Sequence, residues 1–294
     1  MGRKRPIESM RTREETISSA DYSRLRTLIY EQSGIVLNQE KKTMLELRIK
    51  RRLRSLSISS FGQYCEYLFA RHNHQEEIVH LLDVVTTNKT DFFREPDHFE
   101  YLVQKAVPDL VAREQIDKGL LVWSAGCSTG EEPYTLAMVL SEYARLHPGF
   151  RFRVLATDLS TTVLAKAKLG VFCNEVIQPI SSELRRRYFM RSRDPEDNTV
   201  RVVPELRHLV DFRRVNFMDS DFGLTEKVHI IFCRNVIIYF DRRTQENILQ
   251  KLTNHLIPGG YAFLGHSETL HGMDLPLVPI APALYRRDHA RHGH

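Results

Sequence analysis

A glycine-containing loop followed by two glutamates is the first sign of chemistry in this 294-residue chain. The stretch "WSAGCSTGEEPYTLAM" covers residues 123–138, with Gly126 and Gly130 in the loop and Glu131 and Glu132 directly after it. A helix that begins after such a loop binds anions, because its free N–H groups and its dipole face the ligand. However, the loop lacks the middle glycine of the dinucleotide fingerprint and the lysine of a phosphate-binding loop. Two carboxylates would repel a pyrophosphate, so we expect a ligand that is cationic or free of phosphate.

A further acid lies at the end of the next apolar run. Asp158 closes "RFRVLATD", 28 residues after Gly130. At that point of a strand–helix–strand unit, a carboxylate reaches the two hydroxyls of a ribose. A carboxylate that binds a ribose, next to a loop that lacks phosphate-binding residues, predicts a positively charged nucleoside as the ligand. S-adenosylmethionine is such a nucleoside. The alternative is that Glu131 and Glu132 only stabilise the start of the helix, by about 0.3–1 kcal/mol each.

The elements that must position these residues alternate along the chain. Apolar runs predict strands at residues 120–126, 151–158, 227–235, 259–265 and 277–287, and helical patterns lie at 132–146, 160–170 and 242–256. This alternation predicts an α/β fold, with a mainly parallel, Rossmann-like sheet and helices on both faces. Residues from about 174 to 214 break the pattern. There the turn "DPEDN", between "YFMR" and "TVRVV", predicts an inserted small antiparallel β-subdomain.

The first part of the chain has a different character. Residues 1–18 are charged and aperiodic, so we expect a disordered lead. Residues 19–85 predict an all-helical domain, whose first helix has Asp21 as N-cap and Gly34 as C-cap. The second helix, "QEKKTMLELRIKRRLRSL", carries a predicted buried stripe at helical spacing, formed by Leu45, Ile49, Leu53 and Leu56. Residues 86–294 form the predicted second domain.

The net charge of +5 is concentrated near the N-terminus. Residues 1–60 hold 14 Lys and Arg against 7 Asp and Glu, a net charge of +7, while the other 234 residues hold 28 against 30, a net charge of −2. Arg48, Arg51 and Arg52 lie on a different helix face from the leucine stripe, so we expect them to be solvent-exposed and to meet an acidic partner. The helix has no interleaved aromatic residues, which weakens a single-stranded RNA interpretation.

Composition excludes several other classes. No apolar run approaches the roughly 20 residues of a membrane helix, and no apolar segment follows the basic N-terminus as it would in a secretory signal. We therefore expect a cytoplasmic protein without membrane insertion. The four cysteines form no CxxC pair, which argues against a zinc site and a disulfide framework. We predict no metal, and we expect the histidines of the C-terminal "HARHGH" to bind metal only incidentally.

Five motifs, taken together and in order, resemble the chemotaxis receptor glutamate methyltransferases, the CheR family. They are "TTNKTDFFREPDHF", "WSAGCSTGEEPY", "ATDLS", "IIFCRNVIIYFD" and "PGGYAFLGHSE", and the resemblance covers residues 20 to 286. It implies an N-terminal helical domain, a methyltransferase domain with an inserted β-subdomain, and S-adenosylmethionine as cofactor, with S-adenosylhomocysteine as product. The implied partners are chemoreceptor cytoplasmic helices and, in some members, a receptor C-terminal tail peptide. We expect a monomer and no nucleic acid partner.

The resemblance also implies roles for individual residues. Arg94 and Tyr239 would hold the acceptor carboxylate at the transferred methyl group. The expected cofactor-binding residues are Asn88, Thr90, Arg94, Gly126, Glu131, Glu132, Asp158, Asn216, Phe217, Arg234 and Asn235, and the expected receptor-docking residues are Arg48, Arg51 and Arg52. Without the resemblance, Asn216 reads as a turn residue and Tyr239 as a core residue.

The predicted reaction is methylation of receptor glutamates to methyl esters. A glutamate substrate is already ionised at neutral pH, so we interpret His266 in "GHSE" as structural rather than as a general base. Two alternatives remain open: a methyltransferase that acts on RNA or another protein, and a cofactor-binding signalling module without turnover.

Overall fold

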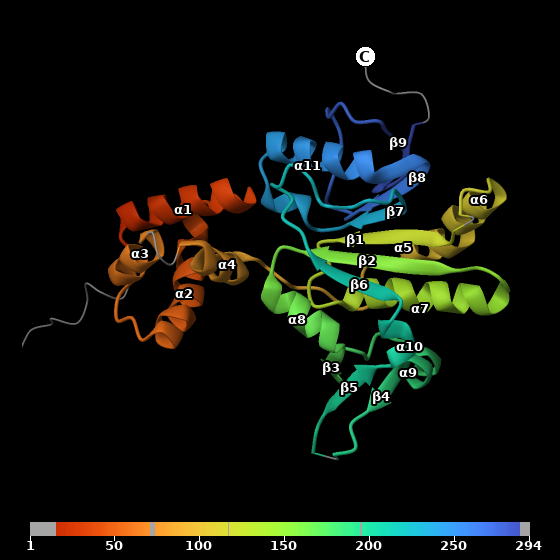
Figure 1. The fold of residues 1–294 in the computed structure, drawn as a ribbon, viewed down its shortest axis with the longest axis horizontal. Helices are drawn as coiled ribbons and strands as arrows, with labels where there is room; N and C mark the ends of the chain where they lie inside the picture. The colour runs from red at the N-terminus through yellow and green to blue at the C-terminus, as the bar shows by residue number, and fades with distance from the viewer. Residues whose placement is uncertain (1–15, 71–73, 117, 195, 289–294) are drawn as a thin grey trace, which may run out of the picture. The chain divides into compact units, whose positions relative to one another are not determined.

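The chain divides into two compact units, Met1–Thr86 and Thr87–His294. This computed structural model describes residues 16–70, 74–116, 118–194 and 196–288 (Figure 1). Of the disordered lead predicted at residues 1–18, residues 1–15 therefore lie outside the described residues. Ile17, near its end, is buried, and its N–H donates to the Glu46 carboxylate at 2.9 Å. None of the helices in the described ranges has the length and apolar character needed to cross a membrane.

Unit 1 consists of helices, as predicted. They are α1 (Ser19–Ser33), the short 3-10 helix η1 (Gln39–Lys41), α2 (Lys42–Leu56), α3 (Phe61–Phe69) and α4 (His74–Val85). The predicted N-cap of α1 is wrong: Ser18, not Asp21, caps the helix, because its extended backbone lets the hydroxyl accept the Asp21 N–H at 3.0 Å. Gly34 is the C-cap, in the left-handed conformation, as predicted.

The predicted exposure of the α2 arginines is wrong for two of the three. Leu45, Ile49 and Leu53 are buried as expected, whereas Leu56, the fourth residue of the predicted stripe, is only half-buried. However, Arg48 donates to the carbonyls of residues 84, 85 and 86, at 3.1, 2.7 and 2.9 Å. It thereby satisfies the last turn of α4, whose carbonyls have no partner within their own helix.

Arg52 is likewise occupied within unit 1. Its guanidinium pairs with the buried Glu77 carboxylate, with 2.6 Å between Nη2 and Oε2, and the Tyr64 hydroxyl donates to the same carboxylate at 2.9 Å. Arg51 is exposed as predicted. Arg48 and Arg52 therefore join α2 to α4, and only Arg51 of the three keeps the exposed position that was predicted.

Unit 2 is built on a seven-stranded sheet with the order β6-β2-β1-β7-β8-β10-β9 (Figure 1). Its first five strands in this order are parallel, and β10 and β9 form an antiparallel hairpin at the edge. The strands are β1 (Leu120–Ala125), β2 (Phe152–Asp158), β6 (Val210–Arg214), β7 (Val228–Cys233), β8 (Leu256–Leu264), β9 (Leu277–Ala281) and β10 (Leu284–Arg287). The single last strand predicted at 277–287 is thus two strands.

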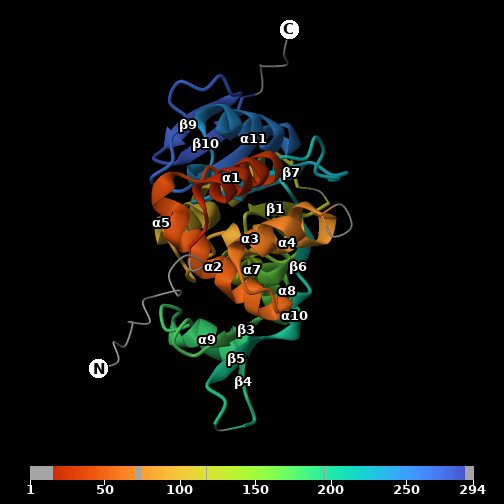
Figure 2. The same cartoon turned by 90° about the vertical axis from the view of Figure 1, so that its left-hand side faces the viewer.

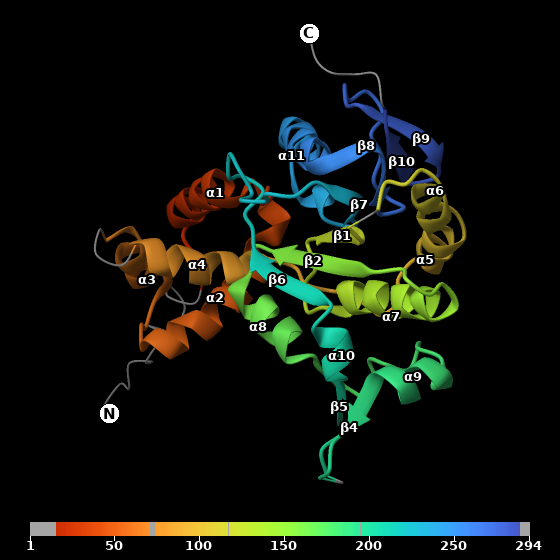
Figure 3. The same ribbon diagram turned by 45° about the vertical axis from the view of Figure 1, so that its right-hand side comes forward.

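Helices cover both faces of the sheet (Figure 3). One core packs residues of α7 (Glu131–Leu146) and α8 (Thr161–Leu169) under the sheet, and the other packs α11 (Arg242–His255) on the opposite face. Three further segments precede β1, namely α5 (Pro96–Tyr101), the π-helical η2 (Leu102–Ala106) and α6 (Val107–Ala112). The strand order reverses direction around β1, so a crevice for a ligand is expected beyond the carboxyl ends of β1, β2 and β7.

The inserted β-subdomain is present, with different bounds from those predicted (Figure 2). Its sheet has the order β3-β5-β4, with β3 (Val171–Cys173), β4 (Phe189–Arg191) and β5 (Thr199–Val202), and it is accompanied by α9 (Ser182–Tyr188) and α10 (Pro204–Arg207). The predicted hairpin around "DPEDN" is the β4–β5 pair. The predicted end at residue 214 is wrong, because β6 pairs in parallel with β2 in the main sheet.

Candidate active site

The loops after β1, β2 and β7 form the candidate site at one edge of the main sheet. Gly126 follows β1 with φ +90°, and a Cβ there would lie 2.4 Å from Cγ2 of Val236, in the loop after β7. Only glycine permits this close approach. The N–H groups of Gly126 and Cys127 donate to the Thr157 carbonyl at 2.8 and 2.9 Å, which fixes the loop against β2.

Asp158 fastens two backbone segments at the end of β2. Its Oδ2 accepts the Ser128 N–H at 2.9 Å, and its Oδ1 accepts the Ser160 N–H at 2.9 Å. The Ser128 hydroxyl in turn donates to the Asn88 carbonyl at 3.0 Å. Each carboxylate oxygen has two lone pairs and can accept more than one hydrogen bond.

Both glutamates lie in the first turn of α7, and both have internal partners. Glu131 is 6% exposed, and its Oε2 accepts the Thr129 hydroxyl at 2.6 Å. The Oε1 of Glu132 accepts the Ser124 hydroxyl at 2.7 Å. Burial raises the pKa of both carboxyl groups. The carboxylates make this end of the sheet unfavourable for a phosphate and favourable for a cationic group.

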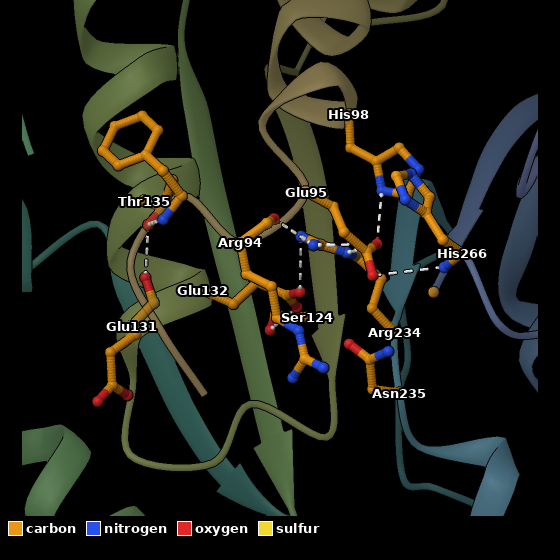
Figure 4. Close-up of polar contacts among 12 residues, drawn as sticks. Arg94, Glu95, His98, Ser124, Glu131, Glu132, Thr135, Arg234, Asn235 and His266 are labelled. Carbon is orange, nitrogen blue, oxygen red and sulfur yellow. Dashed lines mark hydrogen bonds and ion pairs between the residues drawn. The ribbon is translucent and has the colours of Figure 1, made fainter. Parts of the chain in front are cut away.

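Arg234, at the end of β7, is an internal residue (Figure 4). Its side chain is 2% exposed, with Nη2 3.2 Å from Oε2 of Glu95 and Nη1 3.4 Å from Oε2 of Glu132. It also donates to the carbonyl of Arg94 and lies over the Phe99 ring, 5.3 Å from its centroid. The guanidinium therefore holds the segment that carries Arg94, whereas the sequence suggested that Arg234 contacts the cofactor.

Arg94 is presented by a strained segment. It is partly exposed, and its guanidinium donates to the Lys89 carbonyl at 3.3 Å. Its neighbours Phe93 and Glu95 have φ angles of +56° and +53°, which cost side-chain-bearing residues roughly 1–3 kcal/mol each. Such strain persists only where surrounding contacts impose it, and the bond from Arg234 is one of them.

Glu268 is a site residue whose role the sequence did not reveal. This carboxylate is 6% exposed and accepts four backbone N–H groups, from Gly265 at 2.6 Å and from Asn235, Val236 and Ile237 at 2.9 Å. It holds Asn235 at φ +58° in the loop after β7. No local pattern signals this role, because three of the four partners lie more than 30 residues earlier in the chain.

The remaining predicted residues follow β6 or β7, precede α5, or follow β8. Asn216 forms a turn in which its Oδ1 accepts the Met218 N–H at 3.0 Å, and the next residue, Phe217, is buried. Tyr239 ends the 3-10 helix η3 (Ile237–Tyr239) and is half-buried, as are Asn88 and Thr90. His266 pairs with Asp97, with 3.2 Å between Nε2 and Oδ2.

Comparison with known proteins agrees with this architecture. Residues 88–279 match the model of the CheR methyltransferase SAM binding domain, and residues 20–86 match that of the CheR methyltransferase all-alpha domain. The first match identifies the unit with the glycine loop as a domain that binds S-adenosylmethionine.

Curated relatives align over nearly the whole chain. A chemotaxis protein methyltransferase of Salmonella typhimurium is 39% identical over 262 residues, which cover 89% of this chain and 88% of the relative. Those of Escherichia coli and Borreliella burgdorferi are 39% and 35% identical, over 90% and 92% of this chain and 89% and 95% of theirs. With both domain models and these relatives matched, the chain belongs to the CheR methyltransferase family.

Proposed function

We propose that the protein methylates glutamate side chains of chemoreceptors, with S-adenosylmethionine as methyl donor, to give glutamate methyl esters. The observation that carries the proposal is the placement of Arg94. The buried Arg234 donates to the backbone carbonyl of Arg94 and so holds the strained segment from which the partly exposed Arg94 guanidinium projects (Figure 4). A guanidinium on a segment held in this way suits a carboxylate acceptor.

The residues present fit S-adenosylmethionine. Asp158 would accept the ribose hydroxyls, and Glu131 and Glu132 would give a negative potential suited to a ligand with cationic groups and no phosphate. We propose further contacts from the loop residues Asn88, Thr90, Gly126, Asn216, Phe217, Arg234 and Asn235, with Arg234 contributing through its backbone. When bound, the cofactor supplies a methyl group attached to a positively charged sulfur.

The chemistry requires positioning more than proton transfer. A glutamate with a pKa of about 4.3 is ionised at neutral pH, so the acceptor needs no base. The acceptor oxygen would take the methyl group that the bound cofactor supplies, and the electron pair of the broken carbon–sulfur bond would stay on sulfur, so that a negative and a positive charge would disappear together. Arg94 and the Tyr239 hydroxyl would orient the acceptor for this in-line attack.

The exposed face of α2 is the proposed site of receptor docking. Leu47, Arg51 and Arg54 are spaced at i, i+4 and i+7, and all three are exposed, Leu47 at 63%. This face replaces the docking residues predicted from the sequence, because the side chains of Arg48 and Arg52 bind to residues of α4. An acidic amphipathic receptor helix would meet one apolar and two cationic side chains there.

The β-subdomain offers a second receptor contact. In the order β3-β5-β4, the outer strands leave backbone groups available to an added strand, as in recognition of an extended peptide. We propose that a receptor tail binds at such an edge in receptors that carry one, and that the protein acts as a monomer.

The decisive experiment is a methylation assay with labelled S-adenosylmethionine on purified receptor signalling fragments, with and without their C-terminal tails. We expect label that mild alkali releases as methanol, because methyl esters hydrolyse there, and we expect no transfer to fragments whose acceptor glutamates are replaced by alanine. Label that resists alkali, or transfer to total RNA instead of receptor, would reject the proposal. We expect Arg94→Ala to lose receptor methylation. If its affinity for S-adenosylhomocysteine is unchanged, Arg94 positions the acceptor and does not bind the cofactor.

A further inference from the structure

A group of two histidines and a glutamate lies behind the segment that carries Arg94. Glu95, His98 and His266 each offer one ligand atom, and these atoms lie within 4.8 Å of one another. Glu95 and His98 are three residues apart at the start of α5, and His266 follows β8. Glu95 is the N-cap of α5, with φ +53°, and His98 lies in the first turn, with 3.5 Å between Glu95 Oε2 and His98 Nδ1.

His98 provides an independent indication of a ligand. Its side chain is 3% exposed, and neither ring nitrogen has a hydrogen-bond partner among the described residues. Glu95 Oε2 is 3.5 Å from Nδ1, a separation at the outer limit for a hydrogen bond. Buried polar atoms are nearly always paired, so two unpaired nitrogens on one ring require an explanation.

We propose that Glu95, His98 and His266 bind a divalent transition metal of the zinc class. Imidazole nitrogens with one carboxylate oxygen form a ligand set that suits Zn²⁺, Co²⁺ or Ni²⁺ and disfavours Mg²⁺ and Ca²⁺. Burial lowers the pKa of His98 to about 4, so its ring is neutral at physiological pH, the form that binds metal.

The surroundings provide the outer contacts that metal ligands usually have. Oε2 of Glu95 lies 3.2 Å from Nη2 of Arg234, and Oε1 accepts the His266 N–H at 3.3 Å, so both contacts orient the carboxylate. Each carboxylate oxygen has two lone pairs and can therefore also bind a metal. The Asp97 carboxylate lies 3.2 Å from Nε2 of His266 and is available as an outer partner or a fourth ligand.

The ligand atoms lie within 4.8 Å of one another and must approach by up to about 1.4 Å, since bonds of about 2.0–2.1 Å at tetrahedral angles bring ligand atoms to within roughly 3.4 Å. The side chain of His266 is 48% exposed and has room for this movement. The site is separate from Asp158 and the glycine loop. It borders the active site through Arg234, which pairs with Glu95, and through Arg94, which precedes Glu95 in the chain.

The test is a Co²⁺ titration of the full-length, metal-stripped protein, monitored by the visible absorption of tetrahedral cobalt. His289, His292 and His294 are first replaced by alanine in every sample, so that they do not compete for metal. We expect one Co²⁺ per chain, displaced by Zn²⁺ and not by Mg²⁺. His266→Ala should weaken binding at least about tenfold, and His98→Ala should abolish it, while the exposed His271→Ala serves as matched control and should bind as the parent does.

The partly exposed His266 keeps the test informative even if the buried His98→Ala variant fails to fold, which circular dichroism would reveal. Absence of a tetrahedral cobalt spectrum in the parent, or equal Co²⁺ affinity in His266→Ala and the parent, would overturn the proposal. Because metal binding is measured directly, this result does not depend on the proposed methylation.

Discussion

At the scale of single residues, Asp158 links the protein's own loops to the expected ligand. Asp158→Ala removes a charged acceptor from the ribose and from the Ser128 and Ser160 N–H groups. We expect S-adenosylhomocysteine binding to weaken by roughly 1.5–3 kcal/mol in isothermal titration calorimetry. Glu226→Ala is the matched control, since this carboxylate is 62% exposed and pairs with Arg153. An affinity equal to that of the wild type in Asp158→Ala would contradict the ribose assignment.

His98 makes stability depend on pH in a defined window. Its pKa falls from 6.5 to about 4 on folding, chiefly because burial disfavours the charged ring and also because Arg234 lies nearby. Between these values the unfolded chain binds more protons than the folded one, so stability falls as pH decreases from about 6.5 to 4. The maximal slope from this residue is about 1.4 kcal/mol per pH unit.

Denaturant melts between pH 7 and 5, with a chelator present, measure this slope. We expect His98→Asn to lose less stability than the wild type over that interval. The comparison isolates His98, because burial also lowers the pKa of His229 and His255, which both proteins share. Equal slopes for the two proteins would show that His98 does not titrate as described.

At the scale of elements, the site depends on the close approach of two loops at the sheet edge. Gly126→Ala places a Cβ 2.4 Å from Val236 at φ +90°, so the loops after β1 and β7 must separate. Gly149 is a matched control, with φ +91° and no atom within 4 Å of an added Cβ.

Gly149→Ala should lose about 1–2 kcal/mol of stability from backbone strain, and Gly126→Ala should lose more, because its Cβ also displaces Val236. Only Gly126→Ala should also lose S-adenosylhomocysteine affinity, because only there is the cofactor crevice displaced. Thermal melts and calorimetry on the same preparations measure both effects. Equal cofactor affinity in the two variants would mean that the contact between the loops does not shape the crevice.

At the scale of the whole molecule, charge and cofactor chemistry are divided between two units. The +7 of residues 1–60 belongs to unit 1, whereas Asp158 and the glycine loop belong to unit 2. Arg51→Glu with Arg54→Glu should therefore raise the KM for receptor by about tenfold at low salt. Cofactor affinity should stay constant, and the effect should shrink at high salt because exposed charges are screened.

Arg52→Met is the contrasting variant on the same helix. It leaves the buried Glu77 without its cation, so it should lower the stability of unit 1 by roughly 3 kcal/mol. Methylation kinetics, salt series and thermal melts distinguish the two variants. A folded Arg51→Glu, Arg54→Glu protein with an unchanged receptor KM at low salt would show that this face only contacts solvent.

The sequence by itself determined the elements and the ligand class. Alternating apolar runs predicted the strands of the main sheet except β6, with β9 and β10 as a single strand, and they predicted the helices between them. They did so because burial on a sheet or helix face imposes a local period. The acids at Glu131, Glu132 and Asp158 predicted a phosphate-free, cationic ligand, since their chemistry follows from their place after a loop or a strand.

Only the tertiary structure decided which charged side chains are free to act. Arg48 and Arg51 look alike in the sequence, yet Arg48 donates to the carbonyls that end α4 while Arg51 is exposed. Arg234 donates a hydrogen bond to the backbone carbonyl of Arg94, and Glu268 accepts hydrogen bonds from four backbone N–H groups. These partners come from residues far apart in the chain. A buried charge must be paired wherever folding places a partner, and local periodicity carries no information about that placement.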